Sequence, residues 1–185
     1  MLFFVMLCII GCSKTSNNSI GQTSTVSQTL PTREIDPPIN TGEWNIEYYQ
    51  DEFGEVTNNS YIELVGSGIF SNYAATDKEM SAILIVDKSS ISLSLVEYRH
   101  WVMKEDAIFD LKIKDSNENI TKFRLRNTRS GSIKFTNNNY TKMMSILKNE
   151  GTIRCSGELH NSYRSNPYTF SFNLDGFNEA LSLVK

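Results

Sequence analysis

Few side chains in this sequence have the spacing that metal or acid–base chemistry requires. The two histidines are His100 and His160, and Glu158 stands two residues before the second of them. Residues two apart on a strand share a face, so Glu158 and His160 are placed to meet one metal ion. Two ligands fall short of a zinc site, which takes three or four protein ligands. We therefore predict a solvated strand face here, with no bound metal and no cofactor.

Carboxylates and a thiol offer two other kinds of catalysis. Cys155 with His160 has the residue types of a nucleophile and its base. The two are five residues apart, which places them on opposite faces of one strand, and the pattern favours a small buried cysteine. A glycan hydrolase would use two carboxylates such as Glu158 and Asp110. That alternative needs both in one pocket, about 5 to 10 Å apart.

Two short motifs also have a chemical and a structural interpretation. Residues 66–68 (Gly-Ser-Gly) lack the further glycine and the strand-to-helix setting of a nucleotide-binding loop, so we predict a β-bulge there. Residues 98–101 (Tyr-Arg-His-Trp) combine aromatic and basic side chains and would suit the rim of a ligand groove. The interpretation we favour is a partly buried Trp101 with solvated basic neighbours.

The most distinctive feature is a charged hairpin. Residues 109–113 and 122–126 alternate apolar with polar side chains, and residues 115–119 between them have turn chemistry. A period of two predicts a β-hairpin with its apolar side chains inward and its charges outward. Five cations then share the outer face, which we call the basic face: Lys112, Lys114, Lys122, Arg124 and Arg126.

The basic face is the candidate binding surface. Asp110 and Glu118 are the acids near enough to offset its five cations. Such a surface suits an anionic glycan, lipid head groups or an acidic protein. The alternative is an outer face that keeps the domain soluble and prevents edge-to-edge pairing.

Further elements are needed to position this hairpin, and most are predicted to be strands. Alternating or short apolar runs bounded by turn residues predict strands near 43–50, 61–70, 83–86, 91–95, 132–135, 152–159 and 168–174. Helical spacing predicts a helix over 138–149, stopped by Gly151, and another over 177–184. A turn is expected over 51–59. The connection between the last two predicted strands is expected to include residues 161, 162, 166 and 167. The fold class is therefore mainly β: a β-sandwich-like antiparallel domain over 43–185 with two short helices near the C-terminus.

The N-terminal segment differs in kind from this domain. Residues 1–12 form an apolar run that ends in Ile-Ile-Gly-Cys, and this resembles the bacterial lipobox. The resemblance implies a signal peptide over 1–11, lipid on Cys12, and a chain held outside the cytoplasm on a membrane. Ser13 after the cysteine favours the outer membrane over the inner. A leader normally begins with Lys or Arg, and none precedes Lys14, so we expect the true start a few codons upstream.

Residues 12–42 have the composition of a tether. They are rich in Ser, Thr and Asn, contain three of the four prolines and hold no aromatic residue. Such a segment buries too little apolar surface to offset the entropy of ordering it. About 30 flexible residues reach on the order of 30 Å. If Cys8 leaves with the leader and Cys12 carries lipid, Cys155 is left without a disulfide partner.

The C-terminal half also resembles a known family. The hairpin is followed by Ile133-Lys134-Phe135, by a helical segment over 140–148, and by the unit Phe170-Ser171-Phe172-Asn173-Leu174-Asp175-Gly176-Phe177 with Ala180-Leu181. This order is similar to the type VI secretion-associated VasI-like family of exported β-rich proteins. Unlike that family, segment 83–86 carries no cysteine. The resemblance implies a β-rich exported domain and no established catalytic residues.

Three functions follow as hypotheses. The leading one is a non-enzymatic envelope lipoprotein that binds a protein or an anionic polymer. An immunity- or inhibitor-type lipoprotein against a toxin or hydrolase is the second, and a glycan-acting enzyme is the third. A formal net charge of −3 gives no drive toward nucleic acid. The oligomeric state is not predicted.

Overall fold

The computed structural model describes residues 39–127, 131–161 and 164–185. The predicted signal peptide, Cys12 and residues 13–38 lie outside the described residues. Residues 39–42, predicted as the end of the tether, belong to the described structure. Thr41 and Gly42 lie directly against the turn at Asp175 and Gly176, where a Cβ on either glycine would overlap the opposite backbone. The folded part thus begins a few residues before the predicted domain start.

Strands dominate the described residues, as the alternating patterns predict. Two helices and ten strands occur in this order: β1 (Asn45–Gln50), β2 (Val56–Phe70), β3 (Lys78–Val86), β4 (Ile91–Glu97), β5 (His100–Trp101), β6 (Ile108–Lys114), β7 (Ile120–Arg126), β8 (Ile133–Phe135), α1 (Asn138–Leu147), β9 (Thr152–Asn161), β10 (Arg164–Asn173) and α2 (Phe177–Ser182).

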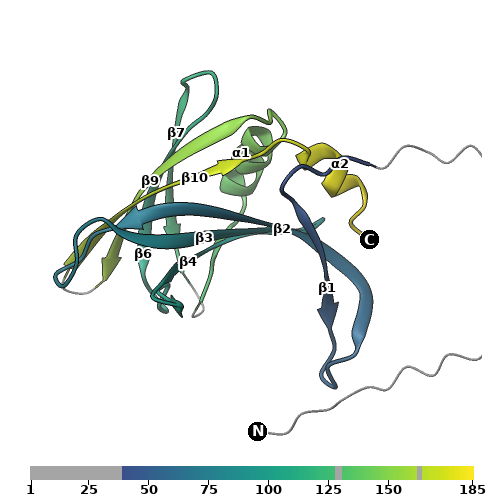
Figure 1. The fold of residues 1–185 in the computed structure, drawn as a ribbon, viewed down its shortest axis with the longest axis horizontal. Helices are drawn as coiled ribbons and strands as arrows, with labels where there is room; N and C mark the ends of the chain where they lie inside the picture. Colours follow the sequence, from purple (N-terminus) through teal and green to yellow (C-terminus); the bar gives the residue numbers. More distant parts are fainter. Residues whose placement is uncertain (1–38, 128–130, 162–163) are drawn as a thin grey trace, which may run out of the picture. The chain divides into compact units, whose positions relative to one another are not determined.

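All ten strands belong to one antiparallel sheet that folds back on itself. Its order is β5-β4-β3-β2-β10-β9-β6-β7, with β1 paired to β2 and β8 paired to β4. Figure 1 shows β2, β3 and β4 running side by side, with β9 and β10 crossing above them in that view. Strand β7 meets β8 where Phe123 and Phe135 pack edge to face at 5.3 Å. The predicted β-sandwich-like fold with two helices near the C-terminus is confirmed.

The folded sheet forms two layers: the first holds β1 to β5 and β8, and the second holds β6, β7, β9 and β10. The core lies between the two layers and takes alternate side chains from the strands. Leu84 and Leu93 from one layer and Phe109 and Ile153 from the other are 0 to 2% exposed. Helix α1 adds Met143 and Leu147, and α2 adds Phe177 and Ala180. Burying such side chains is the main favourable term in folding, since each contributes about 1.5–3 kcal/mol.

Three local predictions were wrong. Residues 66–68 form no bulge, because β2 pairs with β3 without interruption from Ile62 to Phe70. The glycines are needed there for a different reason: β10 is the antiparallel neighbour of β2 and lies so close that a Cβ on Gly68 would overlap the carbonyl oxygen of Thr169. Strand β2 already begins at Val56, inside the predicted turn. Asn166 and Pro167 were expected in a connection but lie within β10. Pairing between β10 and β2 begins only at Tyr168, so the missing N–H of Pro167 is tolerated.

The turn between β3 and β4 depends on the ionised form of Asp87. Partial burial opposes ionisation, but hydrogen bonds from Ser89, Ser90 and the Tyr49 hydroxyl outweigh it and lower the pKa of Asp87 from 3.8 to about 2. A lowered carboxyl pKa stabilises the fold above the unfolded-state value, and this contribution is lost as the pH falls toward 2. We expect the urea midpoint to fall between pH 4 and pH 2. Asp87→Asn should flatten this part of the profile, whereas an unchanged profile would contradict the role of Asp87.

Candidate functional site

The predicted basic face lies on the outer surface of the second layer. Strands β6 and β7 form the predicted hairpin, and Lys112 lies directly opposite Lys122, Asp110 opposite Arg124 and Ile108 opposite Arg126. Alternate residues such as Phe109 and Leu125 point into the core. All five predicted cations therefore share one face of the sheet.

Both arginines of the basic face are paired with acids. Arg126 Nη2 lies 3.0 Å from Asp106 Oδ1. Arg124 Nη1 lies 3.5 Å from Asp110 Oδ2. Both arginines are more than two-thirds exposed, so these ion pairs contribute about 0–1 kcal/mol each. The pairing fixes where the guanidinium groups lie and leaves less charge for a partner.

Glu118 in the β6–β7 turn partly neutralises the opposite end of the face. It forms ion pairs with Lys114 and, at 2.7 Å, with Arg154 of β9. Hydrogen bonding to the Lys114 ammonium is the main cause of a lowered pKa for Glu118. Arg154 is a sixth cation that the sequence did not assign to this surface, because its strand follows 26 residues after the last residue of β7.

Lys112 and Lys122 stand apart from these pairs. They are direct cross-strand neighbours on β6 and β7. Among the ion pairs within the described residues, neither lysine has an acidic partner. Like charges directly opposite each other on a sheet are destabilising. The centre of the basic face thus carries two positive charges that the domain itself leaves unneutralised.

A depression of about 300 Å³ is lined by Lys112 of this pair, and we call it the basic groove. The register places Ser156 of β9 next to Lys112, and Thr169 of β10 next to Ser156. Ammonium groups and hydroxyls therefore follow one another across four strands. The residues lining the groove are Lys112, Lys114, Ile120, Arg154, Cys155, Ser156 and Thr169. Most of the exposed surface inside the groove is apolar, and Lys112, Lys114 and Arg154 supply its positive charge.

The histidine and carboxylate candidates are engaged with other residues. His160 Nε2 lies 3.0 Å from Asp110 Oδ2, and Ser165 donates a hydrogen bond to Glu158. Asp110 and Glu158 are cross-strand neighbours on the open outer face. No group of three metal-ligating side chains occurs in residues 39–127, 131–161 and 164–185. Both carboxylates are thus held by neighbouring side chains on this face.

Cys155 is a core residue, as predicted. Its side chain is 2% exposed, and burial raises the pKa of the thiol. A raised pKa keeps the sulfur protonated and unreactive at neutral pH. The thiol and His160 point to opposite sides of β9, because they differ by an odd number of positions.

The aromatic and basic motif at 98–101 forms the turn into β5 and the start of that strand. Tyr98 and Arg99 have φ values of 47° and 69°, as in a tight two-residue hairpin turn. The prediction of a partly buried Trp101 was wrong, because its side chain is 57% exposed on the edge strand β5, which has no outer neighbour to cover it in the described structure.

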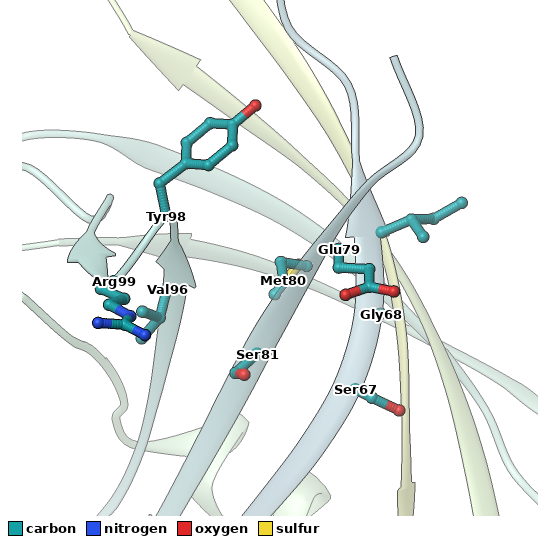
Figure 2. A pocket seen from close by; sticks show the side chains of 9 residues that line it. Ser67, Gly68, Glu79, Met80, Ser81, Val96, Tyr98 and Arg99 are labelled. Carbon is teal, nitrogen blue, oxygen red and sulfur yellow. The ribbon is translucent and has the colours of Figure 1, made fainter. Parts of the chain in front are cut away.

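Tyr98 and Arg99 line an open depression of about 690 Å³ on the first layer (Figure 2). Ser67 of β2 and Ser81 of β3 form its floor, and Glu79 lies beside them. Figure 2 shows the Tyr98 ring and the Arg99 guanidinium pointing away from each other. The Tyr98 ring packs on the edge of Phe70 at 5.4 Å. Because its polar groups do not converge, this depression is a weaker candidate than the basic groove.

A buried carboxylate that the sequence did not reveal lies at one end of the two layers. Glu97 of β4 is 9% exposed, and its Oε1 accepts a hydrogen bond of 2.6 Å from the Tyr168 hydroxyl. Asn72 donates to Oε2 at 3.5 Å. Burial, followed by this contact with Glu97, raises the pKa of Tyr168. The two residues are 71 positions apart in the sequence and join β4 to β10, and their satisfied hydrogen bonds indicate a structural role.

Fold and surface together define a β-rich domain with a cationic outer sheet face. No protein-family model, curated protein or solved structure matches this chain. Within the described residues, no helix has the length and apolar character needed to cross a membrane. The resemblances to a lipobox and to the VasI-like family stay predictions.

Proposed function

We propose that this chain is a lipid-anchored, non-enzymatic binding protein of the cell envelope, and that its β domain holds an anionic partner on the basic face. The observation that carries the proposal is the Lys112–Lys122 pair. The two ammonium groups are neighbours without an acid within the described residues. An external anion would relieve that repulsion, so binding would gain free energy that the isolated domain lacks.

The setting of the pair supports binding over catalysis. Ser156 and Thr169 add hydroxyl donors beside Lys112, and Arg154 adds a further cation at the groove. Anion recognition needs only such donors and charges. Hydrolysis needs carboxylates in a shared pocket, whereas Asp110 and Glu158 lie on an open face and each bonds another side chain.

The anchor sets which partners are within reach. Lipid on Cys12 would hold the domain near a bilayer, and a tether of about 30 residues would let it move on the order of 30 Å from that point. Anionic envelope polymers, lipid head groups and acidic proteins lie within that distance. An immunity- or inhibitor-type lipoprotein would use the same mode of binding, and its partner would be an acidic toxin or hydrolase.

Neutralising the lysine pair tests the binding role. We expect the double variant Lys112→Gln/Lys122→Gln to bind polyphosphate and poly-glutamate about 10- to 30-fold more weakly, because each lysine near an anionic surface contributes about 1 kcal/mol. Fluorescence anisotropy of labelled probes measures this. The salt slope of binding should fall with the lost charges.

The matched control removes the same charge elsewhere. Lys134 and Lys142 are exposed on β8 and α1, outside the basic face. Lys134→Gln/Lys142→Gln should bind both probes like the wild type. Equal losses in the two double variants would mean that net charge alone governs binding, and the proposed site would be rejected. A preference for polyphosphate or for poly-glutamate would separate phosphate polymers from acidic proteins.

A further inference from the structure

Strand β1 and the first part of β2 form an arm that extends beyond the rest of the sheet. Strand β3 ends at Val86, opposite Ile62, so β2 residues before Ile62 pair with β1 alone. Figure 1 shows this two-stranded ribbon leaving the sheet on the side away from β9 and β7. We call residues 47–61 the arm. A ribbon of two strands is marginally stable by itself, and within the chain it is held by the hydrogen bond from the Tyr49 hydroxyl to Asp87.

The arm exposes an unusual amount of apolar side chain. Phe53 at its tip is 81% exposed, Val56 68% and Tyr48 45%. The outer edge of β1 has no strand partner among the described residues. Proteins usually protect such edges, because free N–H and C=O groups and apolar side chains invite another chain. Aromatic side chains at an exposed tip are typical of a docking element.

Charge decides what kind of surface would receive the arm. Residues 43–77 contain no Lys or Arg, and their seven acids are Glu43, Glu47, Asp51, Glu52, Glu55, Glu63 and Asp77. Burial and then the charge of Glu47 raise the pKa of Glu63, so these two acids repel each other. No described cation pairs with either. A surface that receives the arm would therefore be complementary if it were cationic.

The same chain carries such a surface. Lys112 and Lys122 repel each other on the outer face of β6 and β7, as Glu47 and Glu63 do on β1 and β2. We propose that the arm tip of one copy docks into the basic groove of a second copy. This inference rests on the proposed function, since it uses the same groove, and it names a second copy of this chain as one acidic partner.

The tip and the groove match in chemistry as well as in charge. Glu52 and Glu55 flank Phe53 at the tip, and all three are exposed. In the groove Ile120 is 61% exposed beside Lys112 and Lys114. The Phe53 ring would rest on Ile120 and on the aliphatic stems of the lysines. The flanking carboxylates would meet the ammonium groups of Lys112 and Lys122.

Docking of this kind has two possible outcomes for assembly. Two copies that exchange arms reciprocally close into a dimer, whereas one-way docking continues into a longer assembly. In either case a polyanion competes with the arm for the basic groove. Self-association should therefore weaken when polyphosphate is added and when salt is raised from about 50 mM to about 500 mM.

Charge exchange between the two surfaces tests the proposal. The arm variant is Glu52→Lys/Glu55→Lys and the groove variant is Lys112→Glu/Lys122→Glu, each in the full chain and in nonionic detergent. Sedimentation velocity from low to high micromolar concentration should show association of the wild type and of neither variant. An equimolar mixture of the two variants should associate again, because a basic arm then meets an acidic groove. Lys134→Glu/Lys142→Glu is the control and should associate like the wild type.

Any one of three results would overturn the inference. The wild type could stay a single species, association could survive both charge exchanges, or the mixture of the two variants could fail to associate. Circular dichroism melting of each variant shows that it is folded. If the wild type does not associate but still binds polyphosphate through Lys112 and Lys122, the self-docking inference fails and the proposed function stands. If polyphosphate also fails to bind, both fail.

Discussion

Gly157→Val is expected to destabilise the domain by at least about 3 kcal/mol. Gly157 lies in the middle of β9 and faces the core, where the Phe109 ring lies directly over it. A Cβ at this position would overlap Cζ of Phe109, whose side chain is fully buried and has no free space to enter. The whole free energy of unfolding of such a domain is about 5–15 kcal/mol, so this loss would remove about a fifth to more than half of it and lower the melting temperature by several degrees.

Urea denaturation followed by circular dichroism measures this loss. A smaller side chain opposite should restore part of it, so we expect Gly157→Val/Phe109→Leu to be more stable than Gly157→Val alone. Phe109→Leu by itself should be mildly destabilising, and the positive coupling between the two changes is the signature of direct contact. Additive losses would show that Phe109 does not occupy the space over Gly157.

Cys12→Ser is expected to move the protein from the membrane fraction to the soluble fraction almost completely. Lipid chains on the sulfur of Cys12 would be the anchor under this proposal, and serine has no thiol to carry them. Cell fractionation followed by immunoblotting measures the change, and mass spectrometry of the mature chain shows whether Cys12 carries lipid.

Cys155→Ser is the matched control for the anchor, because it removes a thiol that is buried in the core. This variant should stay with the membrane even if it is somewhat less stable. Retention of Cys12→Ser on the membrane, or an unmodified Cys12 in the wild type, would remove the lipid anchor from the proposal. The anionic partner of the basic groove would then no longer have to be a component of the cell envelope.

Local patterns in the sequence are sufficient for most of the secondary structure. The alternation in 109–113 and 122–126 predicts both strands of the β6–β7 hairpin and which side chains face outward. The helical spacing of Met143 and Leu147 predicts α1 in the same way. These features depend on side chains a few residues apart, and such neighbours are fixed by backbone geometry alone.

The glycines show where local patterns mislead. Gly66 and Gly68 interrupt an apolar run, and a bulge is the usual reason. In the structure they make room for β10, which is about a hundred residues further along the chain. Gly157 has the same role under Phe109. A missing side chain marks a close approach, but the sequence does not say which segment approaches.

From the sequence alone came the prediction of a leader and a tether, together with the β-rich class and the orientation of five cations on one hairpin face. Only the tertiary structure decided that β9 and β10 lie beside that hairpin, bringing Arg154, Ser156 and Thr169 to Lys112. It also decided that Arg124 and Arg126 are paired while Lys112 and Lys122 are not. The physical reason is that the period of a strand sets the face on which each side chain lies. The neighbours of that side chain come from other strands, and the order of those strands is fixed by burial of the whole core.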